Sequence, residues 1–489
     1  MNRTTLHRLL PPVLAFALGA VGVFGYAPFY LYPLPILALA GLIHLVRVNG
    51  AAFGLAYAYA LGAFLAGVSW VYVSMHEVGG MPAPLAGLAV LLFAAYLALF
   101  PAAAVGLAAR WPLTEGWRWL TAFPALWLVA EWLRGTLLTG FPWLALGYAQ
   151  APAGPLSGYA PVFGVYGVGA LAAFTAAALA LRRWPGLALA AAVWLAGLGL
   201  MQLPWTRPVG EPVSVSLLQG NIEQSLKFRP ERLAGTLATY RELALASRAR
   251  LILLPETALP IFLDDVPPPY LAELAAHARA QGGDLVVGVP LREGERYYNA
   301  VVTLGSAPAQ TYRKVHLVPF GEFVPWGFRW FVALMDIPLG DFARGPRAQP
   351  PLAAAGQRLA VNICYEDVFG EELLHALPAA TLMVNVSNDA WFGDSLAPWQ
   401  HLQITQMRAL ETGRWWLRAN NTGITAIVDA RGRVRARLPP FTTGALHGSA
   451  QGHAGLTPYA RWGNAAALAA AGLTLALTGA LGRRQRPPG

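Results

Sequence analysis

The sequence predicts a polytopic α-helical membrane domain of eight transmembrane helices combined with an extracytoplasmic α/β domain. Two observations lead to this fold class. Hydrophobic residues make up 56% of the 489 residues and charged residues only 12%, a composition that places part of the chain in lipid. In addition, long apolar stretches occupy the two ends of the chain, whereas residues 209–460 alternate short β-rich runs with amphipathic helical patterns.

Eight apolar stretches each approach the roughly 20 residues that a helix needs to cross about 30 Å of hydrocarbon. Proline and glycine within them are tolerated where neighbouring helices pack. The first stretch is not expected to be a cleaved signal peptide, because further spans follow at once and no small-residue cleavage site is evident. The expected spans are residues 9–27, 30–47, 51–73, 84–109, 119–138, 160–181, 185–203 and 463–481.

The formal charge of +10 comes from the hydrophobic parts of the chain. Residues 209–460 hold 22 basic and 22 acidic residues, and the remainder holds 13 basic against 3 acidic residues. Arginines in short loops between apolar spans mark topology, and this distribution argues against nucleic-acid binding. A cytoplasmic N-terminus puts ten of the thirteen basic residues on the cytoplasmic side, so the domain at 209–460 is expected on the opposite side.

Three regions are therefore expected: seven transmembrane helices in residues 1–208, the extracytoplasmic domain in 209–460, and the eighth helix with a cytoplasmic tail in 461–489. Buried strands are predicted at 213–218, 251–254, 285–289, 300–304, 359–363 and 382–386. Helices are predicted at 230–249, 269–281 and 398–412, and residues 431–436 resemble a hairpin turn.

Two polar features interrupt the apolar spans. The uncharged aromatic segment 139–159 suits either a loop lying in the membrane interface or a packed connector. Glu131 and Arg134, three residues apart in the fifth span, are spaced to pair on one helical face. Charged groups inside a membrane are functional candidates, and a structural ion pair is an equal alternative here.

Cys364 is the single cysteine of the chain, and it stands where the predicted strand 359–363 ends. A free cysteine is often a small buried hydrophobic residue. At the carboxyl end of a strand, however, a thiol is presented at the edge of a sheet, where α/β enzymes place their chemistry.

Two further strand ends carry groups that suit a nucleophilic thiol. Glu256 follows the apolar strand 251–254, where an unpaired carboxylate is costly without partners or a task. Lys314 is one of only two lysines in a chain whose other basic residues are arginine, so its compact charge is informative. A thiolate nucleophile, a carboxylate base and an ammonium that stabilises an oxyanion indicate acyl transfer through a thioester.

The three elements, in this order, resemble the Glu-Lys-Cys triad of the nitrilase (carbon–nitrogen hydrolase) superfamily. They read Leu-Pro-Glu-Thr around Glu256, Lys-Val-His-Leu-Val-Pro-Phe-Gly-Glu from Lys314, and Cys-Tyr-Glu from Cys364. With seven spans before the domain and one after it, the resemblance is to the bacterial apolipoprotein N-acyltransferase family. It implies an αββα sandwich, with Glu256 as general base, Lys314 as transition-state stabiliser and Cys364 as nucleophile.

The same resemblance implies supporting residues. Glu322 matches a second essential carboxylate, and Tyr365 and Glu366 match residues that are needed beside the cysteine. The segment Gln219-Gly-Asn-Ile-Glu-Gln matches a family element that contains Asn221. Phe228 stands where the family often has tryptophan.

The resemblance also implies substrates and location. The acyl donor would be a glycerophospholipid and the acceptor the α-amine of an S-diacylglyceryl-cysteine at the N-terminus of an apolipoprotein, both in the bacterial cytoplasmic (inner) membrane with the catalytic domain periplasmic. The segments 139–159 and 320–331 are candidates to guide acyl chains. We expect a monomer without a cofactor, and no metal, because His316, His375 and His401 lack metal-ligand spacing.

Two other functions are considered. A membrane-tethered amidase of the nitrilase type would hydrolyse a small amide, but such an enzyme needs only one span. A transporter or receptor whose outer domain only binds a ligand would keep its function after the substitution Cys364→Ser.

Overall fold

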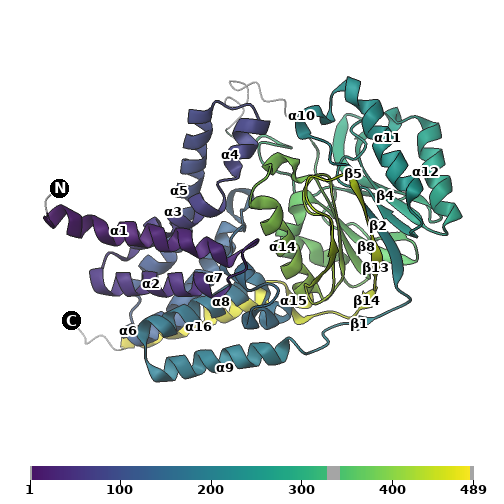
Figure 1. The fold of residues 1–489 in the computed structure, drawn as a ribbon. Helices are drawn as coiled ribbons and strands as arrows, with labels where there is room; N and C mark the ends of the chain where they lie inside the picture. Colours follow the sequence, from purple (N-terminus) through teal and green to yellow (C-terminus); the bar gives the residue numbers. More distant parts are fainter. Residues whose placement is uncertain (1–2, 326, 328–341, 485–489) are drawn as a thin grey trace. The chain divides into compact units, whose positions relative to one another are not determined.

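The computed structural model describes residues 3–325, 327 and 342–484, and the chain forms two compact units (Figure 1). The helical unit comprises Met1–Tyr72, Pro82–Leu203 and Arg461–Gly489. The second unit, called the sandwich unit here, comprises Val73–Met81 and Pro204–Ala460 and contains both large β-sheets.

Two six-stranded sheets form the centre of the sandwich unit. The order in the first sheet is β13 (Gly444–Ala450), β2 (Val213–Gln219), β3 (Leu251–Leu253), β4 (Asp284–Glu293), β5 (Arg296–Gly305) and β6 (Thr311–Arg313). The order in the second is β12 (Val434–Arg437), β11 (Ala426–Val428), β10 (Trp416–Asn420), β9 (Leu382–Ser387), β8 (Gln357–Ile363) and β7 (Leu352–Ala354). A short ribbon pairs β1 (Arg207–Pro208) with β14 (His453–Ala454).

The middle strands of each sheet run parallel, which gathers their carboxyl ends at one edge. β2, β3 and β4 are parallel neighbours in the first sheet, and β8, β9 and β10 are parallel neighbours in the second. Each of these connections needs a crossover. Helices α11 (Pro230–Ala246), α12 (Pro268–Ala280) and α14 (Ala397–Thr412) supply three of them.

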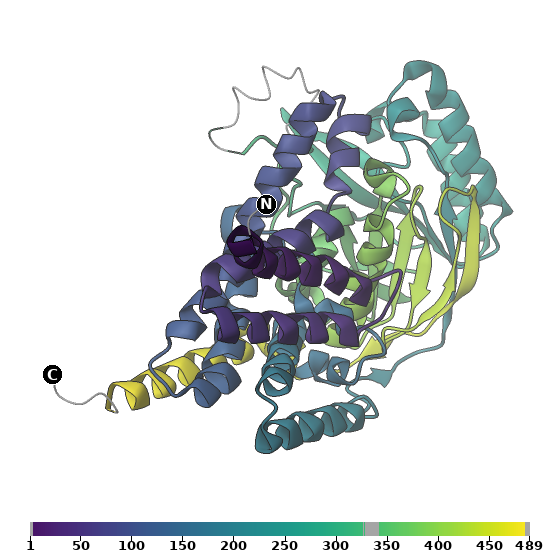
Figure 2. The same ribbon diagram turned by 60° about the vertical axis from the view of Figure 1, so that its left-hand side comes forward.

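The two sheets pack face to face with helices outside them. Valine, leucine and isoleucine side chains of both sheets, such as Leu253 and Ile363, share one buried core. The outer face of the first sheet packs against α11 and α12, and that of the second packs against α14 (Figures 1 and 2). The predicted α/β fold is therefore confirmed, as a sandwich with helices on both outer faces.

All six strands predicted from the sequence are present as β2, β3, β4, β5, β8 and β9. The strands β6, β7 and β10–β13 were not predicted. The run 431–436 is only partly a turn: the side chain of Asp429 accepts hydrogen bonds from the N–H groups of Arg431 and Arg433, and β12 begins at Val434. The sequence pattern did not predict this strand, because arginines alternate along it and few apolar positions remain.

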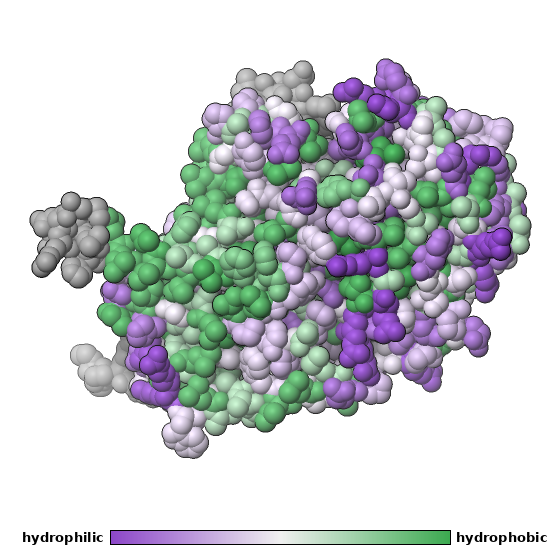
Figure 3. Space-filling model, viewed as in Figure 1, coloured by the Kyte–Doolittle hydropathy of each residue, from purple (hydrophilic) through white to green (hydrophobic). Residues whose placement is uncertain are grey.

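The helical unit contains a long helix or a helical segment at each apolar stretch that the sequence predicts as a span. These are α1 (Arg3–Gly22), α2 (Pro33–Asn49), α3 (Ala52–Gly67), α5 (Ala83–Arg110), α7 (Phe123–Arg134), α8 (Ala160–Leu181), α9 (Trp184–Leu200) and α16 (Ala465–Arg484). Hydrophobic residues gather on the surface over these helices, as the green area of Figure 3 shows, including the exposed Val13, Leu37, Leu92 and Leu195.

Among the described residues, three helices are long and apolar enough to cross a membrane: Ala83–Arg110, Pro155–Leu181 and Ala465–Arg483. A fourth is obtained if the helix broken between Gly67 and Val71 counts as one span. The segments Leu9–Gly25, Pro33–Asn49 and Trp184–Leu200 are apolar but shorter. The predicted span 119–138 ends early, because α7 stops at Arg134 and Leu138 adopts a left-handed conformation with φ of 51°.

Glu131 and Arg134 do not form the ion pair that their spacing suggested. Nη1 of Arg134 donates to the carbonyl oxygens of Phe141 at 2.6 Å and Trp143 at 2.7 Å, and Glu131 Oε1 accepts the N–H of Leu146 at 2.7 Å. Both charged groups thus satisfy backbone groups of the segment 139–159. With Trp143 and Leu146 buried, this segment is a packed connector within the helical unit.

One close backbone approach positions the loop that carries Glu256. This loop lies against β4 at Gly288, where an added Cβ atom would lie 2.1 Å from the carbonyl oxygen of Pro255 and 2.9 Å from Cα of Glu256. The N–H of Leu259 also donates to the Gly288 carbonyl at 3.3 Å. Only glycine allows this contact, since backbone atoms on both sides cannot move as a flexible side chain can.

We expect Gly288→Ala to lower the stability of the protein by about 1–3 kcal/mol, the usual cost of forcing an extra methyl group into packed structure. The midpoint of thermal unfolding in detergent measures this change. Gly235→Ala is the matched control, because Gly235 lies in α11 with no atom within 4 Å of an added Cβ, and alanine there should stabilise by up to about 1 kcal/mol. Equal midpoints for the two variants would contradict the close approach at Gly288.

Candidate active site

Cys364 lies at the first residue after β8, where the strand turns into the 3₁₀ segment Cys364–Val368. Its φ of 53° is in the left-handed region. Residues other than glycine rarely adopt this conformation, and those that do are often found at functional sites. The side chain is 7% exposed. Strand and turn together hold the thiol at the edge of the second sheet.

Glu256 and Lys314 extend from the first sheet. Glu256 is the third residue after β3, and its neighbour Thr257 has a φ of 47°. Lys314 follows β6 directly, and its N–H donates to the carbonyl of Asn299 in β5 at 2.8 Å. Both side chains are buried, with exposed fractions of 8% and 1% for the two residues.

A cluster of buried charges joins these residues. Nζ of Lys314 lies 3.2 Å from Oε1 of Glu256 and 2.9 Å from the carboxylate of Glu322. The side-chain amide of Asn299 donates to Oε1 of both carboxylates at 2.7 Å. Burial disfavours the ammonium, but the two carboxylates outweigh it and raise the pKa of Lys314 above its usual range, so the lysine is a permanent cation.

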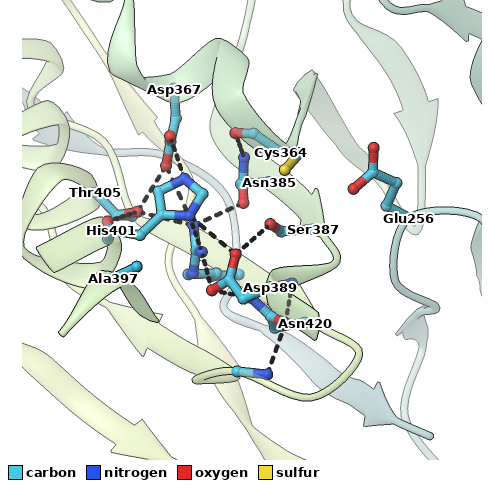
Figure 4. Close-up of polar contacts among 12 residues, drawn as sticks. Glu256, Cys364, Asp367, Asn385, Ser387, Asp389, Ala397, His401, Thr405 and Asn420 are labelled. Carbon is cyan, nitrogen blue, oxygen red and sulfur yellow. Dashed lines mark hydrogen bonds and ion pairs between the residues drawn. The ribbon is translucent and has the colours of Figure 1, made fainter. Parts of the chain in front are cut away.

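The thiol is close enough to this cluster for the charges to act on it. Burial first, and then the negative charges of Glu256 and Asp389, raise the pKa of the Cys364 thiol, while Lys314 and the Ser387 side chain lower it. Figure 4 shows the side chains of Glu256 and Cys364 turned toward one another. A thiol in this state needs an adjacent base to become a nucleophile, and the carboxylate that faces it is that of Glu256.

A buried polar network, called the aspartate–histidine network here, supports the other side of the cysteine (Figure 4). The Ser387 hydroxyl donates to Asp389 at 3.1 Å, and His401 bridges Asp389 and Asp367 at 3.1 and 2.7 Å. Arg418 pairs with both aspartates, at 3.0 Å to Asp389 and 3.3 Å to Asp367. The network fixes Ser387 beside the thiol.

Glu366 ties the cysteine loop to the lysine loop. Its carboxylate accepts the N–H groups of Val315 at 2.6 Å, His316 at 3.1 Å and Ile363 at 2.7 Å, and the Tyr312 hydroxyl at 3.0 Å. Burial raises the pKa of Glu366 to about 7, while Lys314 and these N–H donors oppose the increase. Glu366 makes no ion pair with Lys314 among the described residues; it holds the backbone on either side of the site.

The remaining residues named from the sequence lie in several environments. Tyr365 packs edge-on against Phe369 and His316. Asn221 has a φ of 53° and donates to the carbonyl of Phe441 at 3.1 Å. Phe228 is 61% exposed and no contact places it in the buried cluster. Of the segment 320–331, residues 326 and 328–331 lie outside the described residues.

Two features of the site were not predicted. The aspartate–histidine network joins residues 2 to 51 positions apart in sequence, and its one visible signal was the histidine His401 on α14. The second feature is Lys227, whose Nζ donates to the carbonyl of Glu256 at 3.0 Å. The sequence did contain a signal for this residue, because Lys227 and Lys314 are the two lysines of the chain.

The site contains no arrangement of metal ligands among the residues that the structure describes. In the aspartate–histidine network, where carboxylates and an imidazole converge, the positive charge comes from the Arg418 guanidinium. The reactive groups that the site brings together are the thiol, the carboxylates and the lysines.

Comparison with known proteins places the chain in a family. Residues 18–178 match the model of the apolipoprotein N-acyltransferase N-terminal domain, and residues 214–455 match the carbon–nitrogen hydrolase model. Among solved structures, a carbon–nitrogen hydrolase superfamily protein of Xanthomonas campestris is 19% identical, with a TM-score of 0.38, over 53% of this chain and 93% of that chain.

Full-length relatives are more similar. The apolipoprotein N-acyltransferase of Nitrosomonas europaea is 53% identical over 97% of this chain and 98% of the relative. The apolipoprotein N-acyltransferase of Chromobacterium violaceum is 48% identical over 99% of this chain and 96% of the relative. The resemblance seen in the sequence motifs is confirmed, and the chain belongs to the apolipoprotein N-acyltransferase family, whose catalytic part is a carbon–nitrogen hydrolase domain.

Proposed function

We propose that the protein transfers an acyl chain from a glycerophospholipid, through a thioester on Cys364, to the α-amine of the S-diacylglyceryl-cysteine that begins an apolipoprotein. The observation that carries this proposal is the buried cluster in which Lys314 binds both Glu256 and Glu322 close to the thiol. Family membership supports the substrates, since the relatives are named apolipoprotein N-acyltransferases.

In the first half-reaction, Glu256 removes the proton of the Cys364 thiol and the sulfur attacks the ester carbonyl carbon. The ammonium of Lys314 stabilises the oxyanion of the tetrahedral intermediate. The bond between the carbonyl carbon and the glycerol oxygen then breaks, and that oxygen takes the proton from Glu256. Lysophospholipid leaves, and the acyl chain remains on sulfur as a thioester.

In the second half-reaction, the neutral α-amine of the apolipoprotein attacks the thioester carbonyl. Glu256 takes a proton from the nitrogen, the carbon–sulfur bond breaks, and the proton returns to the thiolate of Cys364. The product is an amide. Glu322 keeps Lys314 in place throughout, Glu366 and Tyr365 hold the cysteine loop, and Asn221 and Phe228 belong to the substrate entrance.

The membrane arrangement follows the same proposal. The eight apolar helical segments cross the bacterial cytoplasmic membrane, seven in residues 1–208 and one in 461–489, and the domain at 209–460 is periplasmic. The arginine distribution supports this orientation, and the hydrophobic surface of the helical unit supports contact with lipid (Figure 3). Both substrates reside in this membrane, and the enzyme acts as a monomer without a cofactor.

The proposal is tested by the mass of the intact protein after incubation with phospholipid in detergent. We expect an increase equal to one acyl group, removed by hydroxylamine, because a thioester is labile to that reagent. The variant Cys364→Ala should show no increase. Apolipoprotein acylation that proceeds without any adduct on the wild-type enzyme, or an adduct that persists in Cys364→Ala, would contradict the thioester route.

Replacing the central cation should slow the first half-reaction. We expect Lys314→Met to slow acyl-enzyme formation by about 10²–10³-fold, the usual cost of losing one group that stabilises an oxyanion. Single-turnover measurements with phospholipid would show this loss. The matched control is Arg313→Met, which removes the neighbouring charge that pairs with Glu293 at the surface; it should change the rate less than twofold. Similar losses in both variants would remove Lys314 from its proposed role.

A further inference from the structure

Lys227 is a second buried lysine in the catalytic site. It ends the short helix α10 (Gln224–Lys227), and only 3% of its surface is exposed. Lysine is almost never fully buried unless it is paired. In a chain that uses arginine for 33 of its 35 basic residues, both lysines are buried in the sandwich unit beside Glu256.

The ammonium of Lys227 contacts the backbone of Glu256, not its carboxylate. Its Nζ donates to the backbone carbonyl of Glu256 at 3.0 Å, whereas Lys314 contacts the Glu256 carboxylate at 3.2 Å. A lysine ammonium has three N–H donors, and the hydrogen bonds within the described residues account for one of those of Lys227. The carboxylate of Glu256 and the sulfur of Cys364 are the charged partners that act on it.

The net charge of the buried side chains around Cys364 indicates what Lys227 does. Glu256, Glu322 and Lys314 alone carry a net charge of −1 when ionised, and a further negative charge on sulfur is then unfavourable in a buried site. With Lys227 protonated these four side chains sum to zero. The buried Glu366, whose pKa burial raises to about 7, also lies within the influence of Lys314 and adds one negative charge when it ionises, in wild type and variants alike. Moving the proton from Cys364 to Glu256 leaves the total charge unchanged, because the carboxylate loses the charge that the thiolate gains. Asp389, which also faces Cys364, has its own partners in Arg418 and His401.

We propose that Lys227 is a positioning residue for the acyl-transfer reaction: its hydrogen bond fixes the backbone of Glu256, and its positive charge stabilises the thiolate of Cys364. The inference deepens the proposed function and rests on it, since the thiolate is the nucleophile of that reaction. A lysine that only fills space would leave the reactivity of the thiol unchanged.

The reactivity of Cys364 can be measured without any lipid, as the rate of alkylation by iodoacetamide followed by the mass of the intact protein. Loss of a neighbouring positive charge raises a thiol pKa by about one unit or more. The thiolate then becomes rarer but somewhat more nucleophilic, so we expect Lys227→Met to be alkylated about 3- to 10-fold more slowly at pH 7. Lys227→Arg, which keeps the charge, should retain more of the wild-type rate.

The pH dependence gives a second readout. Burial lowers the pKa of Lys227 to about 8, although Glu256 and Cys364 favour its charged form. Above that pH the ammonium loses its proton, the thiol pKa rises, and the wild-type alkylation rate should increase less steeply with pH. This change of slope should be absent in Lys227→Met, because methionine does not titrate.

The controls separate the possible explanations. An unfolded variant would expose Cys364 and be alkylated faster, which is the opposite sign to the proposal. Arg229→Met removes an exposed charge two residues away and should leave the rate unchanged. Wild-type rate and pH dependence in Lys227→Met would overturn the proposal. If wild-type protein is alkylated as expected but forms no acyl adduct with phospholipid, the proposed function fails while the role of Lys227 in thiol reactivity stands.

In the complete reaction, the same variant should lower kcat for acyl-enzyme formation more than it changes KM for the phospholipid. The reason is that the thiolate charge develops after substrate binding. An increase in KM alone would show that Lys227 binds substrate instead, and would contradict the positioning role.

Discussion

The active site depends on one buried cation, the ammonium of Lys314, held between the carboxylates of Glu256 and Glu322. Two carboxylates this close to one another repel, and the ammonium between them offsets that repulsion. Asn299 reinforces the arrangement by donating to both carboxylates. A buried ion pair does not by itself stabilise a fold, and we propose that this one keeps a carboxylate base and a cation within reach of the thiol.

The sandwich provides the rigid frame that this cluster requires. Glu256 follows a parallel strand of the first sheet, and Cys364 follows a parallel strand of the second. The two sheets pack on one shared core, which brings the carboxyl ends of these two strands together. The left-handed conformation of Cys364 costs conformational energy, and the surrounding contacts maintain it. Glu366 supplies several of these contacts by binding N–H groups on both sides of the site.

Much of the fold and the three central residues could be predicted from the sequence because their signals are local. The apolar strands β3 and β8 have a clear pattern, and Glu256 and Cys364 stand at their ends. The aspartate–histidine network could not be predicted, since Asp367, His401 and Arg418 come together only through the packing of α14 on the second sheet. Helix ends were also missed: the span predicted at 119–138 stops at Arg134, because its charged groups bind the connector that follows. A hydropathy scale measures the free energy of transferring residues to lipid, and it contains no information on specific hydrogen bonds such as these.

The central claim is that Lys314 remains bound to both carboxylates while it stabilises the acyl carbonyl on Cys364. An experimental structure of the acyl-enzyme, formed with phospholipid in the absence of apolipoprotein, tests this claim most directly. The account predicts a thioester at Cys364 whose carbonyl oxygen lies within hydrogen-bonding distance of Nζ of Lys314, with Glu256 and Glu322 still in contact with that nitrogen. An acyl oxygen directed away from Lys314, or a lysine displaced from the two carboxylates, would contradict it.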